Sequence, residues 1–211
     1  MATKYIIGID EAGRGPLAGP VTVGLLLVEA KKLNFLQKKF FATGVKDSKK
    51  LTAKKREAIW AALNILQKEG KLQYACAHIG PAIIDKKGIS FAVKSGVAKV
   101  LADIAVQPTE CKVYLDGLLS APSIFTKQET IIRGDETEVV IALASVVAKV
   151  SRDYLMAKLA LKYPNYGLEK HKGYGTKLHL EALKRHGLSI IHRRSYLGRL
   201  VQSGRVRDLH K

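Results

Sequence analysis

Four acidic residues stand out in this basic chain because each closes or follows an apolar, strand-like stretch. These are Asp10 and Glu11 after residues 6–9, Asp116 after residues 113–115, and Asp135 after residues 129–133. Hard cations such as Mg²⁺ take oxygen ligands, and two such ions about 3.5–4 Å apart stabilise an in-line displacement at a phosphoryl group. If the strand ends converge at one edge of a sheet, the sequence predicts a two-metal site acting on phosphates.

Each acid also has a purely structural interpretation. Asp10 is suited to cap the turn after its strand, and Glu11 is suited to an exposed position. Asp116 and the glycine after it form a common turn dipeptide. Asp135 with Glu138 fits a helix capping box, with Asp135 at the N-cap. The residues alone leave these local roles and the four-acid site as open alternatives.

The adjacent acids Asp10 and Glu11 impose a geometric condition on a shared site. Consecutive residues of a strand point to opposite faces of the sheet. Both carboxylates therefore reach one site only if the strand ends or twists beside them. Gly13 and Gly15 follow directly and favour such an ending.

The charge of the chain indicates its partner. Its 211 residues include 36 Lys and Arg against 18 Asp and Glu. Two segments hold almost all of the excess: ten basic against two acidic residues between 31 and 57, and eleven against two between 170 and 211. Lys and Arg contacts to phosphates supply affinity without reading sequence. A solvated surface is the alternative for either segment, but two such segments favour a nucleic-acid partner.

Composition argues against several other classes of protein. The longest apolar runs, such as residues 21–28, are far shorter than the roughly 20 residues that cross a bilayer. Residues 1–5 lack the pattern of a signal peptide. Cys76 and Cys111 are too few for a disulfide framework and form no CxxC motif. We expect a soluble, cytoplasmic protein, and nothing in the sequence requires more than a monomer.

Competing motifs fail on their context. Gly13 and Gly15 follow a strand, as in a dinucleotide fingerprint, but prolines and a second apolar strand occupy the place of the required helix. A GxxxxGK[ST] loop is absent. The C-terminal histidines lack neighbouring cysteines and an HExxH pattern, so zinc is not expected. We expect exposed or phosphate-contacting side chains at His171, His179, His186 and His192.

Periodicity and turn residues predict nine elements. Strands are expected at residues 5–10, 21–28, 72–79, 112–116 and 129–133. Helices are expected from Thr52 to Gly70, at 93–104, at 137–162 and at 177–186. This order predicts an α/β fold with a mixed five-stranded sheet flanked by helices. We expect a catalytic domain at residues 1–164, and at 165–211 a basic helical extension that packs on it and contributes to substrate binding.

Six blocks of sequence follow one another between residues 8 and 196. They are GIDEAGRGPLAGPV at 8–21, DSKKL at 47–51, Asp116-Gly117, Gly134-Asp135 with ASVVAKVSRD at 144–153, HKGYGT at 171–176, and HRRS at 192–195. Together these blocks resemble the signature elements of bacterial ribonuclease HII, the type 2 ribonuclease H. The first strand begins within a few residues of Met1, which favours type HII over type HIII with its N-terminal extension.

The resemblance implies a fold and an activity. The implied fold is ribonuclease H-like, and the implied reaction is Mg²⁺- or Mn²⁺-dependent cleavage of the RNA strand of RNA–DNA hybrids, with two ions during catalysis. The resemblance also implies incision on the 5′ side of single ribonucleotides in duplex DNA, leaving 3′-OH and 5′-phosphate ends. That incision would initiate ribonucleotide excision repair.

The resemblance also assigns residues by position. It assigns the catalytic, metal-binding acids to Asp10, Glu11, Asp116 and Asp135. It assigns contact with the ribonucleotide and its 2′-OH to Gly13, Arg14 and Gly15, and packing against the sugar at the RNA–DNA junction to Tyr174. Further phosphate contacts are expected at Lys49, Lys149, Arg152, Arg193 and Arg194. Lys149 stands four residues before Asp153, so a local ion pair on one helix face is its alternative role.

Two other functions stay open at this point. A hybrid-only enzyme like type 1 ribonuclease H needs a run of ribonucleotides, and the loop at residues 13–15 together with Tyr174 argues against it. A nucleic-acid-binding module without catalysis explains the charge equally well. That second alternative gives no purpose to four acids at strand ends.

Overall fold

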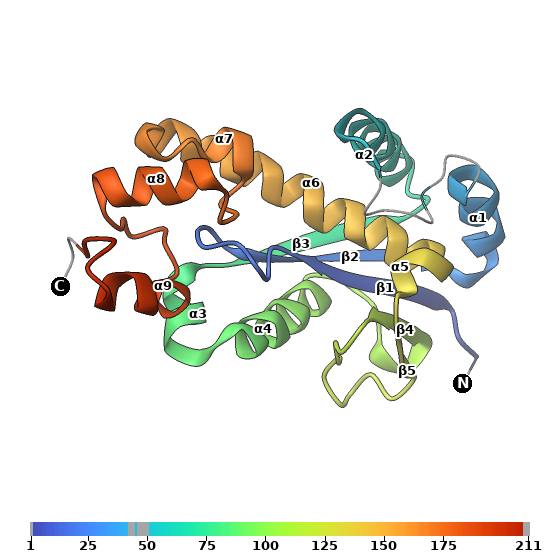
Figure 1. Cartoon of the computed structure of the whole chain (residues 1–211). Helices are drawn as coiled ribbons and strands as arrows, with labels where there is room; N and C mark the ends of the chain where they lie inside the picture. The colour runs from blue at the N-terminus through green and yellow to red at the C-terminus, as the bar shows by residue number, and fades with distance from the viewer. Residues whose placement is uncertain (1, 42–44, 46–50, 209–211) are drawn as a thin grey trace.

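A mixed five-stranded sheet forms the centre of the protein (Figure 1). The structure, a computed structural model, describes residues 2–41, 45 and 51–208. In spatial order the strands are β3 (Gln73–Ile79), β2 (Val21–Glu29), β1 (Tyr5–Ala12), β4 (Cys111–Asp116) and β5 (Gln128–Ile131). β2 pairs antiparallel with β1 and β3, whereas β4 runs parallel to β1 and β5. The predicted mixed sheet is confirmed.

Helices cover both faces of this sheet. The two that contact it most are α4 (Ile89–Ala102) and α6 (Val139–Lys162). The others are α1 (Leu33–Phe41), α2 (Ala53–Lys68), α3 (Pro81–Lys87), α5 (Gly134–Thr137), α7 (Leu168–His171), α8 (Lys177–His186) and α9 (Arg194–Gln202). α6 lies on one face with α1 and α2, and α4 lies on the other (Figure 1). Within the described ranges, no helix is long and apolar enough to span a membrane.

The alternation of side chains along β2 defines two cores. Val23 and Leu25 pack in the core beneath α4, whereas Leu26 and Val28 pack in the core beneath α6. All four side chains are buried. β2 is therefore covered on both faces, which explains why its sequence is a continuous apolar run rather than an alternating one.

The predicted elements are observed, and the structure adds shorter helices to them: α1, α3 and α5, and α7 and α9 within the predicted helical extension. Every strand lies within two residues of its predicted limits, and α8 has the predicted bounds. Thr52 caps α2 as expected, accepting the Lys55 N–H at 3.3 Å. The sequence does not predict α1, which buries Leu36 and Phe40 within a lysine-rich stretch, or α3, a seven-residue helix that buries Ile84. Helices this short carry too few apolar positions to show a clear period.

Two glycines let α6 approach the sheet closely. A Cβ at Gly8 would lie 2.2 Å from the carbonyl carbon of Val140, and a Cβ at Gly24 would lie 2.4 Å from the carbonyl oxygen of Ala144. Gly24 is the partner of Asp10 in the β1–β2 ladder. The close approach therefore brings the first half of α6 over Asp10.

The C-terminal region packs against the far end of α6. A third apolar core joins Met156 and Ala160 of α6 to Leu168, Leu183 and Leu197. Figure 1 shows α7, α8 and α9 grouped at this end, beside the loop that leaves β1. α6 thus contributes side chains to the sheet core and to the C-terminal core.

Backbone contacts tie the same region to the loop at residues 13–20. The Leu17 N–H donates to the Gly173 carbonyl at 2.8 Å, and the Gly19 N–H donates to the Ile191 carbonyl at 2.8 Å. An isolated bridge pairs Ala18 with His192. The C-terminal region therefore supports the loop that follows the first strand.

Candidate active site

The sheet opens between β1 and β4, and acidic side chains border the opening. β1 pairs with β4 only as far as Ile9 and Leu115, but it stays paired with β2 to its end. Beyond that point Asp10, Glu11 and Asp116 line one cleft of about 320 Å³. Three of the four predicted acids are therefore brought to one place.

The opening explains how neighbouring residues of one strand share a cleft. Asp10 follows Gly8 on the face covered by α6, whereas Glu11 follows Ile9 on the face covered by α4. The strand does not end at Glu11, because β1 continues to Ala12. What ends is its pairing with β4, and this leaves both faces of β1 accessible from the same gap.

Asp10 is the most buried of the three acids that line the cleft, with 4 % of its surface exposed. Its Oδ1 accepts the Glu11 N–H at 2.7 Å, and Ser145 of α6 donates a further hydrogen bond. Burial, and then the negative charges of Glu11 and Asp116, raise the pKa of Asp10 well above its ordinary value. The charged form of Asp10 is therefore destabilised unless positive charge enters the cleft.

Glu11 and Asp116 are held at the cleft wall by local contacts. Arg14 Nη1 lies 3.3 Å from Glu11 Oε1. Burial raises the pKa of Glu11, and the charge of Arg14 opposes that rise. The Gly134 N–H donates to Asp116 Oδ1 at 2.7 Å. These contacts fix one oxygen of each carboxylate.

Asp135 lies beside the cleft but does not line it. Its side chain is buried in α5, directly after the Gly134 amide that binds Asp116. The capping-box alternative is wrong, because Arg133 is the N-cap of α5 and Glu138 the N-cap of α6, and neither makes a side-chain capping bond. The backbone thus brings the fourth acid next to the third.

The donor set fits a divalent cation by chemistry and by placement. Within the part of the chain that the structure describes, no three acidic, histidine or cysteine side chains are already arranged to hold a metal ion. Asp10, Glu11 and Asp116 nevertheless present hard oxygen ligands to one cleft. Their mutual repulsion is what a cation would offset. The strands thus bring three carboxylates of the right chemistry for a divalent cation to one cleft.

The loop after β1 contains two glycines with different roles. Gly13 has a φ of +91°, and a Cβ there would lie 2.1 Å from Arg152 Nε, so the fold itself requires glycine. Gly15 has no such φ, and a Cβ there would meet no atom within 4 Å. Gly13 lines the cleft, whereas Arg14 and Gly15 are exposed beside it.

Arg193 binds the backbone of this loop from inside the protein, whereas it is expected from the sequence to contact phosphate. Its side chain is 0 % exposed. Nε, Nη1 and Nη2 donate to the carbonyls of Gly19, Arg14 and Gly13 at 3.0, 2.7 and 2.6 Å. A guanidinium engaged in this way has no surface to offer a phosphate. It orders the backbone that faces the cleft.

Arg152 of α6 has a similar buried place. Its Nε donates to the Pro20 carbonyl at 2.9 Å and its Nη2 to the Ala18 carbonyl at 3.3 Å. Burial lowers its pKa to about 10, so the group is still a cation at neutral pH. The predicted phosphate contact of Arg152 is corrected in the same sense as that of Arg193, because its side chain is 0 % exposed.

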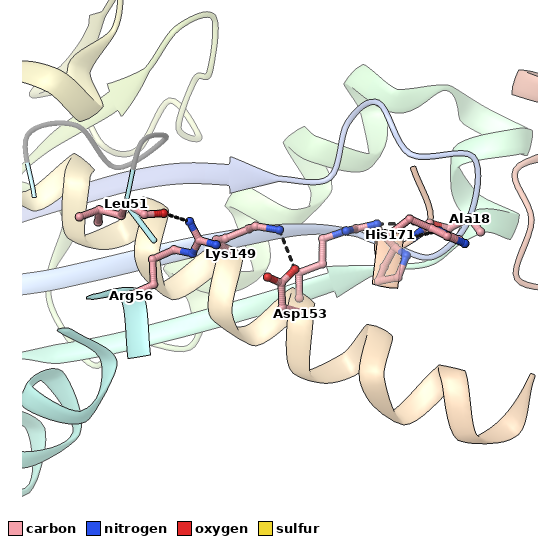
Figure 2. A network of polar contacts seen from close by, with 9 residues as sticks. Ala18, Leu51, Arg56, Lys149, Asp153 and His171 are labelled. Atoms are coloured by element: carbon pink, nitrogen blue, oxygen red, sulfur yellow. Dashed lines mark hydrogen bonds and ion pairs between the residues drawn. The ribbon is translucent and has the colours of Figure 1, made fainter. Parts of the chain in front are cut away.

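Two basic side chains reach the cleft from different helices (Figure 2). Lys149 of α6 lines the cleft and pairs with Asp153 at 2.7 Å, so the local ion pair and the predicted cleft position are both present. Arg56 of α2 also lines the cleft, and its Nη1 donates to the Leu51 carbonyl. The sequence does not single out Arg56, because it is one of ten basic residues in a single segment.

The two other predicted phosphate contacts lie elsewhere. Lys49 lies outside the described residues, so its contact stays a prediction. Arg194 Nη2 pairs with Asp208 at 3.1 Å, and the Arg194 N–H donates to Asp85 Oδ2 at 3.0 Å. These contacts engage Arg194 between the C-terminal region and α3.

Part of the basic charge lies far from the acids. Lys31 and Lys32 both pair with Glu29. Glu29 faces Tyr5 at the start of β1, whereas the cleft lies at the other end of that strand. The basic segment between residues 31 and 57 therefore contributes to the cleft through only some of its side chains.

Tyr174 reaches the cleft from the C-terminal region. It lines the cleft with 44 % of its surface exposed, and its ring centroid lies 5.9 Å from Arg152 Cζ. Its N–H donates to the His171 carbonyl at 2.9 Å, and its carbonyl accepts the Thr176 N–H at 2.8 Å. A tyrosine more than 150 residues after Asp10 and Glu11 is thus placed in the same cleft as these acids.

Of the four histidines expected to be exposed or to contact phosphate (His171, His179, His186 and His192), three are buried. His171, His179 and His192 have 8 %, 0 % and 2 % of their surface exposed. The rings of His171 and His179 stack with centroids 4.4 Å apart, and Nε2 of His179 lies 3.1 Å from Nε2 of His192. Their spacing in sequence follows neither a helix nor a strand period, so the sequence gives no sign of this layer.

One face of α6 connects these features. Ser145, Lys149, Arg152 and Met156 are separated by four, three and four residues, the spacing of one helix face. Ser145 binds Asp10, and Lys149 lines the cleft. Arg152 holds the loop at residues 13–20, and Met156 packs in the C-terminal core.

Sequence comparison identifies related proteins over nearly the whole chain. The family model described as Ribonuclease HII matches residues 7–198. A Ribonuclease HII of Desulfitobacterium hafniense (strain DSM 10664 / DCB-2) is 45 % identical over 192 residues, covering 91 % of this chain and 68 % of the relative. A Ribonuclease HII of Caldicellulosiruptor bescii is 39 % identical over 198 residues, covering 94 % of this chain and 89 % of the relative.

Structural comparison gives the same result for the fold. The crystal structure of the ribonuclease H2 from Pyrococcus horikoshii OT3 matches with a TM-score of 0.74 at 26 % identity. The match covers 95 % of this chain and 99 % of the other. The sheet and its helices therefore have the ribonuclease H-like fold.

Proposed function

The chain belongs to the ribonuclease HII family of metal-dependent endonucleases acting on RNA–DNA hybrids, and we propose that it also incises duplex DNA 5′ to a single embedded ribonucleotide. The products are a 3′-OH and a 5′-phosphate, and the incision initiates ribonucleotide excision repair. The catalytic acids are Asp10, Glu11, Asp116 and Asp135.

One observation carries the proposal: a single cleft contains Asp10, Glu11, Asp116, Gly13 and Tyr174. Acids at a sheet opening can serve many phosphodiester reactions. Recognition of one ribonucleotide needs, in addition, groups that detect the 2′-OH, which alone distinguishes RNA from DNA at a given site. The loop and the tyrosine supply candidates within reach of the acids.

The acids would hold the divalent ions. When bound at Asp10, Glu11, Asp116 and Asp135, Mg²⁺ or Mn²⁺ supplies activation of the attacking water and stabilisation of the leaving 3′ oxygen. The buried Asp10, strained by its acidic neighbours, supports this assignment. In this scheme no histidine serves as general base, and the three buried histidines lie outside the cleft lining.

The other cleft residues have roles that follow from their chemistry. Lys149 and Arg56 offer positive charge to the substrate backbone, whose phosphates the acids would otherwise repel. The fold does not require glycine at position 15, and this supports a role in letting a ligand approach the backbone closely. The half-exposed ring of Tyr174 supplies a flat surface for the sugar at the junction.

The test uses a labelled DNA duplex that contains one ribonucleotide, incubated with Mg²⁺, with Mn²⁺ or with EDTA. An all-DNA duplex and an RNA–DNA hybrid serve as parallel substrates. We expect metal-dependent incision 5′ to the ribonucleotide, with the all-DNA duplex intact. Cleavage of the hybrid alone would replace the proposal with type 1-like specificity, and binding without cleavage would indicate a silent binding module.

Tyr174→Ala tests the junction contact. We expect incision at a single ribonucleotide to fall about tenfold, because the contact between the ring and the sugar, worth about 1.5 kcal/mol, is lost, while binding to all-DNA duplex persists. Tyr154→Ala is a matched control, because Tyr154 is similarly exposed, at 45 %, but does not line the cleft. Equal loss of binding and incision in Tyr174→Ala would indicate a structural role instead.

A further inference from the structure

His171, His179 and His192 form the buried histidine layer. Hydrogen bonds determine which ring nitrogen of each histidine carries the proton. The Ser189 N–H donates to His192 Nδ1 at 3.0 Å, so this nitrogen must be an acceptor. The proton of a neutral His192 is then on Nε2, which faces His179 Nε2 at 3.1 Å. His179 Nε2 accepts that proton's hydrogen bond, and its own proton is on Nδ1, 3.0 Å from the Tyr174 carbonyl.

His171 obeys the same logic independently. The Gly173 N–H donates to His171 Nδ1 at 3.2 Å, so the proton of His171 is on Nε2. That nitrogen lies 2.8 Å from the Tyr166 carbonyl, which can only accept. Each of the three rings, as a neutral imidazole in one tautomer, therefore has a hydrogen-bond partner for both nitrogens.

The layer terminates at the backbone of the residue that enters the cleft. His179 binds the Tyr174 carbonyl, and His171 binds the amide of Gly173, the residue before it. The Gly173 carbonyl in turn accepts the amides of Leu17 and Ala18 at 2.8 and 3.3 Å. The histidines thus hold the junction between the C-terminal region and the loop at residues 13–20.

We propose that His192 and His179 form a neutral, directional relay that positions Tyr174 for a ribonucleotide in the cleft. His179 is the positioning residue in contact with the Tyr174 backbone, and His192 sets its tautomer. The relay fixes the backbone of Tyr174, and thereby the orientation of its ring, without contacting the substrate. This inference rests on the proposed function, because it explains how the junction tyrosine is held.

The surroundings favour the neutral relay. Burial, and then the neighbouring histidines, lower the pKa values of His179 and His192 to about 4. Arg152 of α6 and Arg193 before α9 add cations beneath the adjoining loop, and His186 meets the Tyr166 ring from α8. The charge effects on the two rings come from the histidines of the layer itself, and they disfavour a second proton on either ring.

The first test reads the ring protons directly in the wild-type protein. Long-range ¹H–¹⁵N correlation spectra at pH 7 distinguish the two tautomers and the cation. We expect a proton on Nε2 of His171 and His192 and on Nδ1 of His179. A cationic ring, or a proton on Nε2 of His179, would overturn the relay. This measurement needs neither metal nor substrate, so it is independent of the proposed activity.

The second test uses two exchanges at one position. In His179→Asn the amide nitrogen can take the place of Nδ1 and still donate to the Tyr174 carbonyl, whereas in His179→Gln the amide reaches towards the Nε2 side and that bond is lost. The readout is kcat/KM on a single ribonucleotide divided by kcat/KM on a hybrid. We expect His179→Gln to lower this ratio about tenfold, the equivalent of one lost hydrogen bond, and His179→Asn to keep it within about twofold.

The control is His186→Gln, the same exchange at an exposed histidine outside the relay, which should leave the ratio unchanged. Equal ratios in the two His179 variants would overturn the positioning role. If His179→Gln does not fold, the tautomers in the wild type and the ratio in His179→Asn still decide the question. If the wild type does not cut at a single ribonucleotide, the proposed function fails, whereas the relay stands or falls with the ring protons.

Discussion

The cleft wall and the histidine layer differ in how well their buried polar groups are stabilised. At the cleft wall, burial and like charge raise the pKa values of Asp10 and Glu11, so the carboxylates are poorly stabilised as they stand. In the histidine layer, each ring nitrogen of His179 and His192 has a hydrogen-bond partner, and the rings are stable without charge.

The difference separates a part of the molecule that awaits a ligand from a part that is complete alone. Repulsion among the acids is relieved only by cations from outside, which is the condition for a metal-dependent reaction. The layer needs nothing from outside and orders its neighbours instead. Substitutions should therefore damage activity at the cleft wall and geometry or stability behind it.

Asp10→Asn should have the largest effect. It keeps the shape of the side chain but removes the charge that a cation needs, so we expect turnover to fall by about a thousandfold or more. The measurement is single-turnover cleavage of a hybrid in saturating Mg²⁺, with circular dichroism to verify folding. The free energy of unfolding should rise or stay constant, since one strained charge is removed. Cleavage near the normal rate would contradict the metal-site assignment.

Arg193→Lys should chiefly destabilise the protein. A lysine can replace at most part of the three hydrogen bonds to the carbonyls of Gly13, Arg14 and Gly19, and we expect a loss of about 2–4 kcal/mol in the free energy of unfolding. Urea denaturation measures this loss. Arg185→Lys, at an exposed position of α8, is the control. An unchanged midpoint in Arg193→Lys would show that the loop is held by other contacts.

Gly24→Ala should have an intermediate effect. The added Cβ would overlap the backbone of α6 near Ala144 and Ala148, so the helix must shift, at a cost of about 1–3 kcal/mol. Since Gly24 lies opposite Asp10, cleavage should fall as well. Gly198→Ala in α9 is a matched control, because its Cβ meets nothing within 4 Å, and it should be neutral or slightly stabilising. Equal stabilities of the two variants would refute the close approach of α6.

His192→Asn should have the smallest effect, and it depends on pH. The folded pKa of His192, about 4, lies below the unfolded value of 6.5, so its contribution to stability is present above pH 6.5 and is lost as pH falls towards 4. The stability difference between the wild type and His192→Asn should shrink by roughly 1 kcal/mol between pH 7 and pH 5.5. Thermal or urea denaturation at both pH values measures this change. A constant difference would mean that His192 titrates alike in both states.

The sheet and its acids could be predicted from sequence because both depend on local patterns. Short apolar runs at residues 5–10 and 21–28, separated by glycines and prolines, favour strands, and acids at strand ends are visible without a structure. The gap between β1 and β4 could not be predicted, because it depends on where a ladder between distant strands stops. The sharing of one cleft by Asp10 and Glu11 follows from that gap.

Whether an individual basic side chain is buried or exposed could not be predicted either, because this also depends on partners distant in sequence. Arg152, Arg193 and Arg194 are all predicted to contact phosphate, yet two are buried against backbone carbonyls and one forms a surface ion pair. Sequence shows charge but not the tertiary partners that decide burial. The histidine layer was missed likewise, since its members come from three separate segments.

The continuity of α6 makes the molecule sensitive to insertions in the part of this helix that joins the cleft to the C-terminal core. A helix advances about 1.5 Å and turns about 100° for each residue. One residue inserted between Lys149 and Met156 would therefore rotate the C-terminal core away from the acids, carrying Tyr174 with it. The spacing of Ser145, Lys149, Arg152 and Met156 therefore sets the distance and rotation between the acids and the C-terminal core that positions Tyr174.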